Sequence, residues 1–214
     1  MSLFDESSSR SWQRLPLPGA ELSLWSPWLA SAEADELFAD LLATIAWEIH
    51  RIRIYGREVE SPRLSCWIGD PDATYVYSRT RFEPHPWTPA LTALRARVEE
   101  ACATRFNSVL ANLYRNGQDS MGWHSDNEPE LGAQPVIASL SLGAERRFRL
   151  RAKRGEGKRQ VHVVELGHGS LLRMAGDTQH LYVHDLPKTT SAVGPRINLT
   201  FRQVAAKAAF AALR

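Results

Sequence analysis

The chain has 214 residues, of which 43% are hydrophobic and 23% are charged, and its formal net charge is +2. This balance is that of an ordinary globular protein large enough to bury a core, and it excludes a collagen-like, low-complexity or strongly disordered chain. The small net charge permits a nucleic-acid partner without demanding one, and two cysteines outside any CxxC pair exclude a disulfide framework.

The first ten residues are polar and rich in serine, with no cationic stretch followed by an apolar one, so no signal peptide is predicted. No apolar run approaches the roughly 18 residues that a membrane-spanning helix needs. With the low cysteine usage, these features predict a cytoplasmic protein, or a nuclear one if the cell has a nucleus. Nothing in the sequence demands more than a monomer.

We expect residues 1–12 to form a disordered leader and residues 13–214 a single domain. Ser31 is the predicted N-cap of a first helix, with acidic residues in the first turn, where the helix dipole favours them. The apolar stripe of this helix is Leu37, Phe38, Leu41, Leu42 and Ile45. Thr88-Pro89 is predicted to open a second helix, and a third short helix is expected over Ala205–Leu213.

From residue 109 onward, short segments rich in β-branched or large apolar residues alternate with glycine-rich or polar turns. The predicted strands are Val109–Tyr114, Val136–Leu142, Arg147–Leu150, His162–Val164, Ser170–Met174 and Ile197–Arg202. Residues 52–77, between the first two helices, are predicted to form further strands and turns. Many short strands with local turns favour an antiparallel sandwich or jelly roll, so the expected fold class is mostly β with flanking helices.

His124 and Asp126 form a His-x-Asp pair after a predicted strand and turn, which places them at the start of a further strand. Residues two apart on an extended strand point to the same side, so the imidazole and the carboxylate converge. With His184 from a later apolar run, they make two histidines and one carboxylate, a set that suits Fe(II) with open positions for oxygen chemistry. The pair alone is a weak signal, because most such pairs are surface residues.

Two alternatives stay open at this metal site. His180 lies four residues before His184, and on a strand both would face the same side, so periodicity does not choose between them. Zinc accepts the same ligand set, which makes zinc hydrolysis the chemical rival, although no HExxH pattern accompanies it.

Polar and apolar residues alternate through the run from Arg196 to Arg202. The apolar face is Ile197, Leu199 and Phe201, and the polar face is Arg196, Asn198, Thr200 and Arg202. Buried arginines are unfavourable unless they are paired, so we expect Asp126 to pair one and the carboxylate of an organic acid to pair the other. Asn112 and Tyr114 share one side of an earlier strand and offer an amide and a phenol to a second carboxylate.

Three runs carry a resemblance to a known family. They are Asn112-Leu113-Tyr114 through His124-Ser125-Asp126, Leu181 through Pro187, and Arg196-Ile197-Asn198-Leu199-Thr200-Phe201-Arg202. They closely resemble the AlkB family, the Fe(II)- and 2-oxoglutarate-dependent nucleic-acid dealkylases with a double-stranded β-helix fold. The resemblance spans about residues 61–204. Residues 135–144 and 168–172 are more similar to the branch with the vertebrate duplex-DNA repair enzyme than to the founding bacterial member.

The resemblance implies a role for each matching residue near the metal. His124, Asp126 and His184 match the iron ligands, and the match favours His184 over His180. The residues that match cosubstrate contacts are Asn112, Tyr114, Arg196, Asn198 and Arg202, with Arg196 at the distal carboxylate of 2-oxoglutarate.

On the substrate side, the resemblance implies a nucleotide-recognition region over residues 48–80. Tyr75 and Tyr77 match aromatic positions, one of which stacks on the flipped base, and Tyr77 stands where the family usually has phenylalanine. Tyr55 aligns with a wedge residue that fills the gap left by that base, and Glu128 matches an acidic residue that faces it. Arginines that include Arg63 flank the wedge and suit a nucleic-acid backbone. Residues 153–159 form a second basic loop.

The implied activity is oxidative demethylation of 1-methyladenine and 3-methylcytosine in DNA, or alternatively RNA, with Fe(II), 2-oxoglutarate and O2. Formaldehyde, succinate and CO2 are the expected products, and repair of alkylation damage is the expected purpose. One rival is a 2-oxoglutarate-dependent hydroxylase of a protein or small molecule, since fold does not fix the substrate. The other is a catalytically silent nucleic-acid-binding module.

Overall fold

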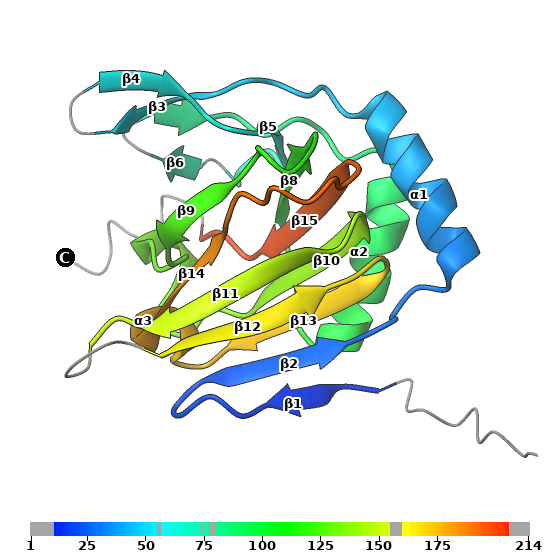
Figure 1. Cartoon of the computed structure of the whole chain (residues 1–214). Coiled ribbons are helices and arrows are strands. Elements are labelled where there is room, and N and C mark those ends of the chain that lie inside the picture. The colour runs from blue at the N-terminus through cyan, green and yellow to red at the C-terminus, as the bar shows by residue number, and fades with distance from the viewer. Residues whose placement is uncertain (1–10, 55–56, 74, 78–79, 155–159, 206–214) are drawn as a thin grey trace, which may run out of the picture.

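The computed structural model describes residues 11–54, 57–73, 75–77, 80–154 and 160–205. Two antiparallel sheets dominate the fold, and Figure 1 shows them as two layers with helices on one side. Residues 1–10 of the expected leader and most of the third predicted helix lie outside the described residues. Trp12, at the end of the expected leader, donates from Nε1 to the carbonyl of Ala101 at 3.1 Å.

The larger sheet has seven strands. In spatial order they are β1 (Gln13–Leu15), β2 (Glu21–Trp25), β13 (Ser170–Ala175), β10 (Ile137–Gly143), β15 (Arg196–Arg202), β8 (Ser108–Tyr114) and β5 (Leu64–Gly69). Strand β15, in the interior of the sheet, pairs along its whole length with β8, from Arg196 opposite Tyr114 to Arg202 opposite Ser108. Strands β1 and β2 were not predicted, and β2 extends the sheet by pairing with β13.

The smaller sheet has four strands. They are β12 (Val161–Leu166), β11 (Arg146–Ala152), β14 (Tyr182–Leu186) and β9 (Met121–His124), in that spatial order. Two further antiparallel pairs stand apart from both sheets: β3 (Arg51–Ile54) with β4 (Arg57–Glu60), and β6 (Tyr75–Tyr77) with β7 (Thr80–Phe82). The predicted jelly-roll class, mostly β with flanking helices, is confirmed.

Two long helices, α1 (Ser31–Thr44) and α2 (Pro89–Cys102), pack on the larger sheet. Thr88 caps α2 as predicted, because its hydroxyl accepts a hydrogen bond from the Leu91 backbone N–H at 3.2 Å. The N-cap predicted for α1 was wrong: the helix begins at Ser31 itself, and Ala30 occupies the cap without a side-chain hydrogen bond. Leu42 was also misplaced on the buried stripe, since it is 39% exposed.

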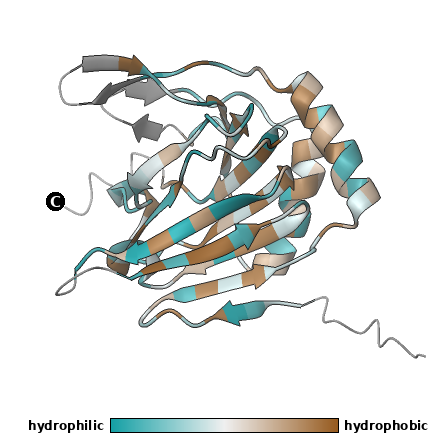
Figure 2. Cartoon of the chain, in the orientation of Figure 1, coloured by the Kyte–Doolittle hydropathy of each residue, from teal (hydrophilic) through white to brown (hydrophobic). Residues whose placement is uncertain are grey.

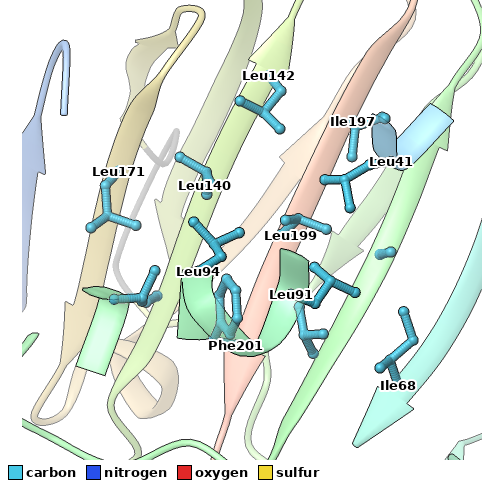
Figure 3. Packing of buried hydrophobic residues seen from close by; sticks show 14 of the residues in the cluster. Leu41, Ile68, Leu91, Leu94, Leu140, Leu142, Leu171, Ile197, Leu199 and Phe201 are labelled. Atoms are coloured by element: carbon cyan, nitrogen blue, oxygen red, sulfur yellow. The ribbon is translucent and has the colours of Figure 1, made fainter. Parts of the chain in front are cut away.

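The alternation of the strands divides the buried residues between two layers. Ile197, Leu199 and Phe201 face α1 and α2, together with apolar residues of β8 and β10, as Figure 3 shows. A second apolar cluster, which includes Phe148 and Leu150, connects the two sheets. Figure 2 shows the resulting change between hydrophobic and hydrophilic residues along the strands. The inner face of the larger sheet therefore carries the polar side of β15.

Among the described residues, no helix combines the length and the apolar character that crossing a membrane would require. Two very short helices, α3 (Thr178–Leu181) and the 3-10 turn η1 (Pro129–Leu131), lie in the connections near the smaller sheet.

Candidate active site

A cavity between the two sheets collects the polar side chains of β8 and β15 and the histidines of β9 and β14. Its walls include all four polar residues of the β15 alternation, namely Arg196, Asn198, Thr200 and Arg202. Buried polar groups need partners, so a cavity with this lining is suited to a small charged ligand.

His124, Asp126 and His184 are brought together in this cavity, and one potential ligand atom from each lies within 4.8 Å of the others. The two histidines face each other across the β9–β14 pair, with ring centroids 4.3 Å apart. Asp126 lies beyond the end of β9, with Oδ1 3.8 Å from Nε2 of His124. The residues thus converge as predicted, but at the end of a strand and in the following loop, not at a strand start.

Asp126 is buried beside a cation. Nη2 of Arg202 donates to its Oδ2 at 2.8 Å, which confirms the predicted pairing of one arginine with this carboxylate. Burial alone would raise the pKa of Asp126, but the charge and the hydrogen bond of Arg202 oppose this and hold that pKa below its usual range. Burial, reinforced by His124, lowers the pKa of His184 to about 3. The site therefore offers a charged carboxylate and a neutral imidazole, the forms that bind metals.

His180, the competing third ligand, does not lie in this cluster. It belongs to the short helix α3, is exposed, and contacts the carbonyl of Ala133 through its Nε2. The premise that His180 and His184 share one strand was wrong, because the strand β14 begins only at Tyr182. His180 lies in a helical turn and His184 in a strand, so the two-residue alternation of a strand does not relate their side chains.

Arg196 lies buried in the same cavity and is incompletely paired. Its Nη2 donates to the hydroxyl of Ser141 at 2.9 Å, whereas its buried Nε has no hydrogen-bond partner among the described residues. Burial, together with the charge of Arg146, lowers the pKa of Arg196 to about 10 despite its contact with Tyr114. A buried guanidinium with an unused donor fits a ligand carboxylate, because such a group is unfavourable until it is paired.

The remaining predicted cosubstrate residues have partners within the protein. Oδ1 of Asn112 accepts a hydrogen bond from Nε of Arg63 at 2.7 Å. Nδ2 of Asn198 donates to Ser139 and to a backbone carbonyl, and its Oδ1 accepts from the hydroxyl of Thr200 at 3.0 Å. These two amides line the cavity in fixed orientations, so each has only part of its hydrogen-bonding capacity left for a ligand.

A model of the 2OG-Fe(II) oxygenase superfamily matches residues 21–202. The chain is 40% identical over 196 residues to alpha-ketoglutarate-dependent dioxygenase alkB homolog 3 of Homo sapiens, covering 88% of this chain and 68% of that protein. It is 37% identical over 206 residues to the DNA oxidative demethylase ALKBH2 of Homo sapiens, covering 92% and 78%. The chain belongs to the AlkB family. The predicted resemblance is confirmed.

A relative of Bos taurus, also an alkB homolog 3, is 44% identical over 179 residues, covering 80% of this chain and 62% of that protein. The chain thus spans less than two thirds of that relative's length. The structure of OsALKBH1 has a TM-score of 0.65 at 19% identity, covering 90% of this chain and 99% of that one, which supports the fold. Membership of the superfamily implies Fe(II), 2-oxoglutarate and O2, and the donors of this cavity fit the metal and a dicarboxylate.

Sequence reasoning missed two residues that brace the AlkB-family site. Gln179, buried in α3, accepts a hydrogen bond at Oε1 from the backbone N–H of Asp126 at 3.0 Å. Arg146 is buried and donates to the backbone carbonyls of Asn116, Asp119 and Pro187. Gln179 lies in a single helical turn without a period, and Arg146 shares the buried face of β11 with Phe148 and Leu150. Both act on backbone atoms far away in sequence, so the local sequence did not mark either as part of the site.

The structure describes the predicted base-recognition residues unevenly. Glu128 is half-buried and directly precedes η1, two residues after Asp126. Arg63 is buried against Asn112, so it does not lie on an exposed surface where a phosphate could reach it. Tyr75 and Tyr77 belong to β6, but their side chains lie outside the described part, as do Tyr55 and residues 155–159 of the basic loop.

Proposed function

We propose that the chain is an oxidative demethylase of N-alkylated bases in DNA, with 1-methyladenine and 3-methylcytosine as substrates and RNA as the alternative nucleic acid. One observation carries this proposal: the His-Asp-His group shares its cavity with a buried arginine whose Nε has no partner among the described residues. The names of the similar proteins, which include a DNA oxidative demethylase, support the substrate class.

His124, Asp126 and His184 are the proposed iron ligands. A metal held by these three residues would keep coordination positions for other ligands. Arg202 holds the Asp126 carboxylate in place through its 2.8 Å hydrogen bond. Bound Fe(II), with O2 and 2-oxoglutarate, supplies the oxidation that hydroxylates an N-methyl group, after which formaldehyde leaves and succinate and CO2 are the co-products.

Arg196 is proposed to bind the distal carboxylate of 2-oxoglutarate. Its guanidinium lies against the ring of Tyr114, 5.2 Å from the ring centroid, so its orientation is fixed before the ligand arrives. Tyr114, Asn112 and Asn198 line the same cavity, and they are proposed to surround that carboxylate. Arg202 lies beside Asp126, the proposed metal ligand. We further propose that Arg63 acts by orienting Asn112, because its Nε contacts that amide directly.

Substrate recognition is proposed to follow the chemistry of the damaged base. 1-Methyladenine and 3-methylcytosine are cationic and pair poorly, so their extrusion from a duplex is inexpensive. The positive charge favours the Glu128 carboxylate and stacking on Tyr75 or Tyr77, and Tyr55 is proposed to fill the gap in the duplex. We propose that the enzyme acts as a monomer in the compartment that contains the DNA.

The test is turnover of an oligonucleotide that contains 1-methyladenine, with Fe(II), 2-oxoglutarate and O2, followed by the mass of the oligonucleotide and by succinate. We expect loss of the methyl mass with stoichiometric succinate, and loss of both signals in His124→Ala. Succinate without demethylation would keep the iron site but assign the enzyme to another substrate, such as a protein or small molecule. Full activity of an iron-loaded His124→Ala variant would contradict the ligand assignment.

A further inference from the structure

The strand that carries His124 is weakly held by its backbone. β9 is a four-residue edge strand of the smaller sheet, and within the described residues it pairs with β14 alone. Its register has two paired positions, His184 with His124 and Leu186 with Met121, with an irregularity between them. Short irregular pairing at an edge gives few hydrogen bonds, so side chains must contribute to fixing this strand.

The orientation of the His124 ring depends on the backbone of the same strand. Nδ1 of His124 donates to the carbonyl of Gly122 at 2.8 Å, which directs Nε2 toward Asp126. Trp123 lies between Gly122 and His124 in sequence, so any movement of Trp123 moves both ends of their hydrogen bond. Such contacts behind a metal ligand fix its ring and commonly determine metal affinity.

Trp123 is held by arginines of β11, two strands away. The guanidinium carbons of Arg149 and Arg151 lie 5.1 Å and 4.2 Å from the centroid of the Trp123 ring. Both distances are within the range of a cation–π interaction. Nε of Arg151 is buried and has no hydrogen-bond partner in the part of the chain that the structure describes. The guanidinium of Arg151 instead packs against the indole of Trp123.

Arg149, one of the two arginines at Trp123, also contacts Asp185, the residue that follows His184. Asp185 is buried, follows His184 in β14, and accepts a hydrogen bond at Oδ1 from Nε of Arg149 at 2.8 Å. In the sheet, Arg149 stands opposite Asp185 and Leu150 stands opposite His184. Alternate residues of a strand face opposite sides. The side chains of Trp123, Arg149 and Asp185 therefore lie on the outer face of the sheet, opposite the face that carries His124 and His184.

We propose that Trp123, Arg149, Arg151 and Asp185 form an outer latch whose function is to position His124 for metal binding. This inference rests on the proposed metal site and adds positioning residues to it. The latch connects β9 to β11 across β14, so it constrains the edge strand where backbone pairing is irregular. Its loss should leave the ligands present but poorly oriented, and the metal affinity should fall.

The experiment is a titration of the metal-free protein with Co(II), read by the visible absorption of the bound ion, without 2-oxoglutarate. We expect Trp123→Ala to weaken Co(II) binding about tenfold or more, the usual effect of removing an outer contact of a ligand. Trp123→Phe keeps an aromatic face for the arginines and should recover most of the affinity. Arg151→Met keeps the apolar stem without the cation and should give a smaller loss in the same direction.

Trp87 provides a matched control far from the metal site in the chain. It is also half-buried, with the guanidinium of Arg95 4.7 Å from its ring centroid and an aspartate, Asp70, bonded to both. Trp87→Ala removes the same kind of contact and should leave Co(II) affinity within about twofold of the wild type. Thermal unfolding of each metal-free variant reports whether it is folded.

Three outcomes would overturn the latch. Co(II) binding by folded Trp123→Ala that equals the wild type would do so, as would an equal loss in Trp87→Ala. If Trp123→Ala does not fold, unchanged affinity in Arg151→Met has the same meaning. The proposed metal site fails differently: the wild type would then not bind Co(II), or His124→Ala would bind it equally well, and the latch would fall with it.

Discussion

At the scale of single residues, Arg196 is the buried charge of the cavity that we expect a ligand to pair. Arg196 retains an unused Nε donor, and only a guanidinium presents two parallel donors to a carboxylate. Arg196→Lys keeps the charge but removes this fork, so we expect the KM for 2-oxoglutarate to rise about tenfold or more, in line with the loss of a charged hydrogen bond. Succinate release measured against 2-oxoglutarate concentration checks it.

The control for this prediction is Arg147→Lys, because Arg147 forms an exposed ion pair with Glu165 and such pairs contribute little. Its KM for 2-oxoglutarate should equal that of the wild type. An unchanged KM in Arg196→Lys would contradict the role assigned to Arg196.

The residues of the site were predictable to the extent that they follow a period. Arg196 and Arg202 were found because polar and apolar residues alternate strictly through β15, and the structure places both in the cavity. Arg146 and Gln179 were not found, because their partners are backbone atoms of distant loops. The ambiguity between His180 and His184 arose because a single helical turn leaves no period in the sequence.

At the scale of elements, the two long helices differ in how they begin. Thr88 caps α2, whereas Ala30 stands at the N-cap of α1 in a suitable extended conformation without a capping side chain. Thr88→Ala should therefore lower the free energy of unfolding by about 1 kcal/mol, and Ala30→Asp should raise it by a similar amount. Urea denaturation of both variants is the measurement. Destabilisation by Ala30→Asp would contradict the observed helix start.

A second element, the turn between β8 and β9, is held by an ion pair. Asp119 is buried and accepts hydrogen bonds from the backbone and side chain of Arg115, at 2.8–2.9 Å. Burial opposes the charged form of Asp119, but the bonds and charge of Arg115 outweigh it and lower its pKa. The carboxylate therefore contributes stability above its unfolded pKa of about 4, and this contribution is lost as the pH falls through the lower folded value.

It follows that Asp119→Asn should lower the free energy of unfolding by about 2 kcal/mol at pH 7, the value of hydrogen bonds to a charged group. This difference should shrink as the pH is taken below about 4, where the unfolded wild type binds a proton. Denaturation of both proteins across this pH range tests it. Asp72→Asn, at an exposed position, should show no such trend, and a difference independent of pH would contradict the role of the charge.

The elements themselves were predictable where they are long and central. β8, β10 and β15 are interior strands of the larger sheet, each paired on both sides, and their buried faces gave clear patterns. β2 was missed, and β9 was misplaced, because the sequence predicted a strand that starts at His124 whereas β9 ends there. Both strands are short, and their pairing is decided by partners far away in sequence. The strand that carries His124 was therefore the least predictable part of the site, and its position depends on tertiary contacts.

At the scale of the whole molecule, the two faces of the larger sheet have separate tasks. One face packs against α1 and α2 and supplies the main apolar core, while the other supplies the polar wall of the cavity. Apolar residues between the sheets, including Phe148 and Met174, close the cavity on its other sides. A rigid apolar layer directly behind the polar one keeps the charged groups in place, because close-packed cores resist deformation.

Both cysteines lie in this main core, which makes them probes of its opening. Cys66 on β5 and Cys102 at the end of α2 are unbridged and only 2% and 4% exposed. Burial raises the pKa of the Cys66 thiol to about 12 and that of Cys102 to about 11. Since the thiolate is the reactive form, we expect a thiol reagent at neutral pH to label neither cysteine in the native protein, and both to become reactive together across the urea unfolding transition. Rapid labelling of either thiol without denaturant would show that the layer between the helices and the larger sheet opens separately from the rest of the fold.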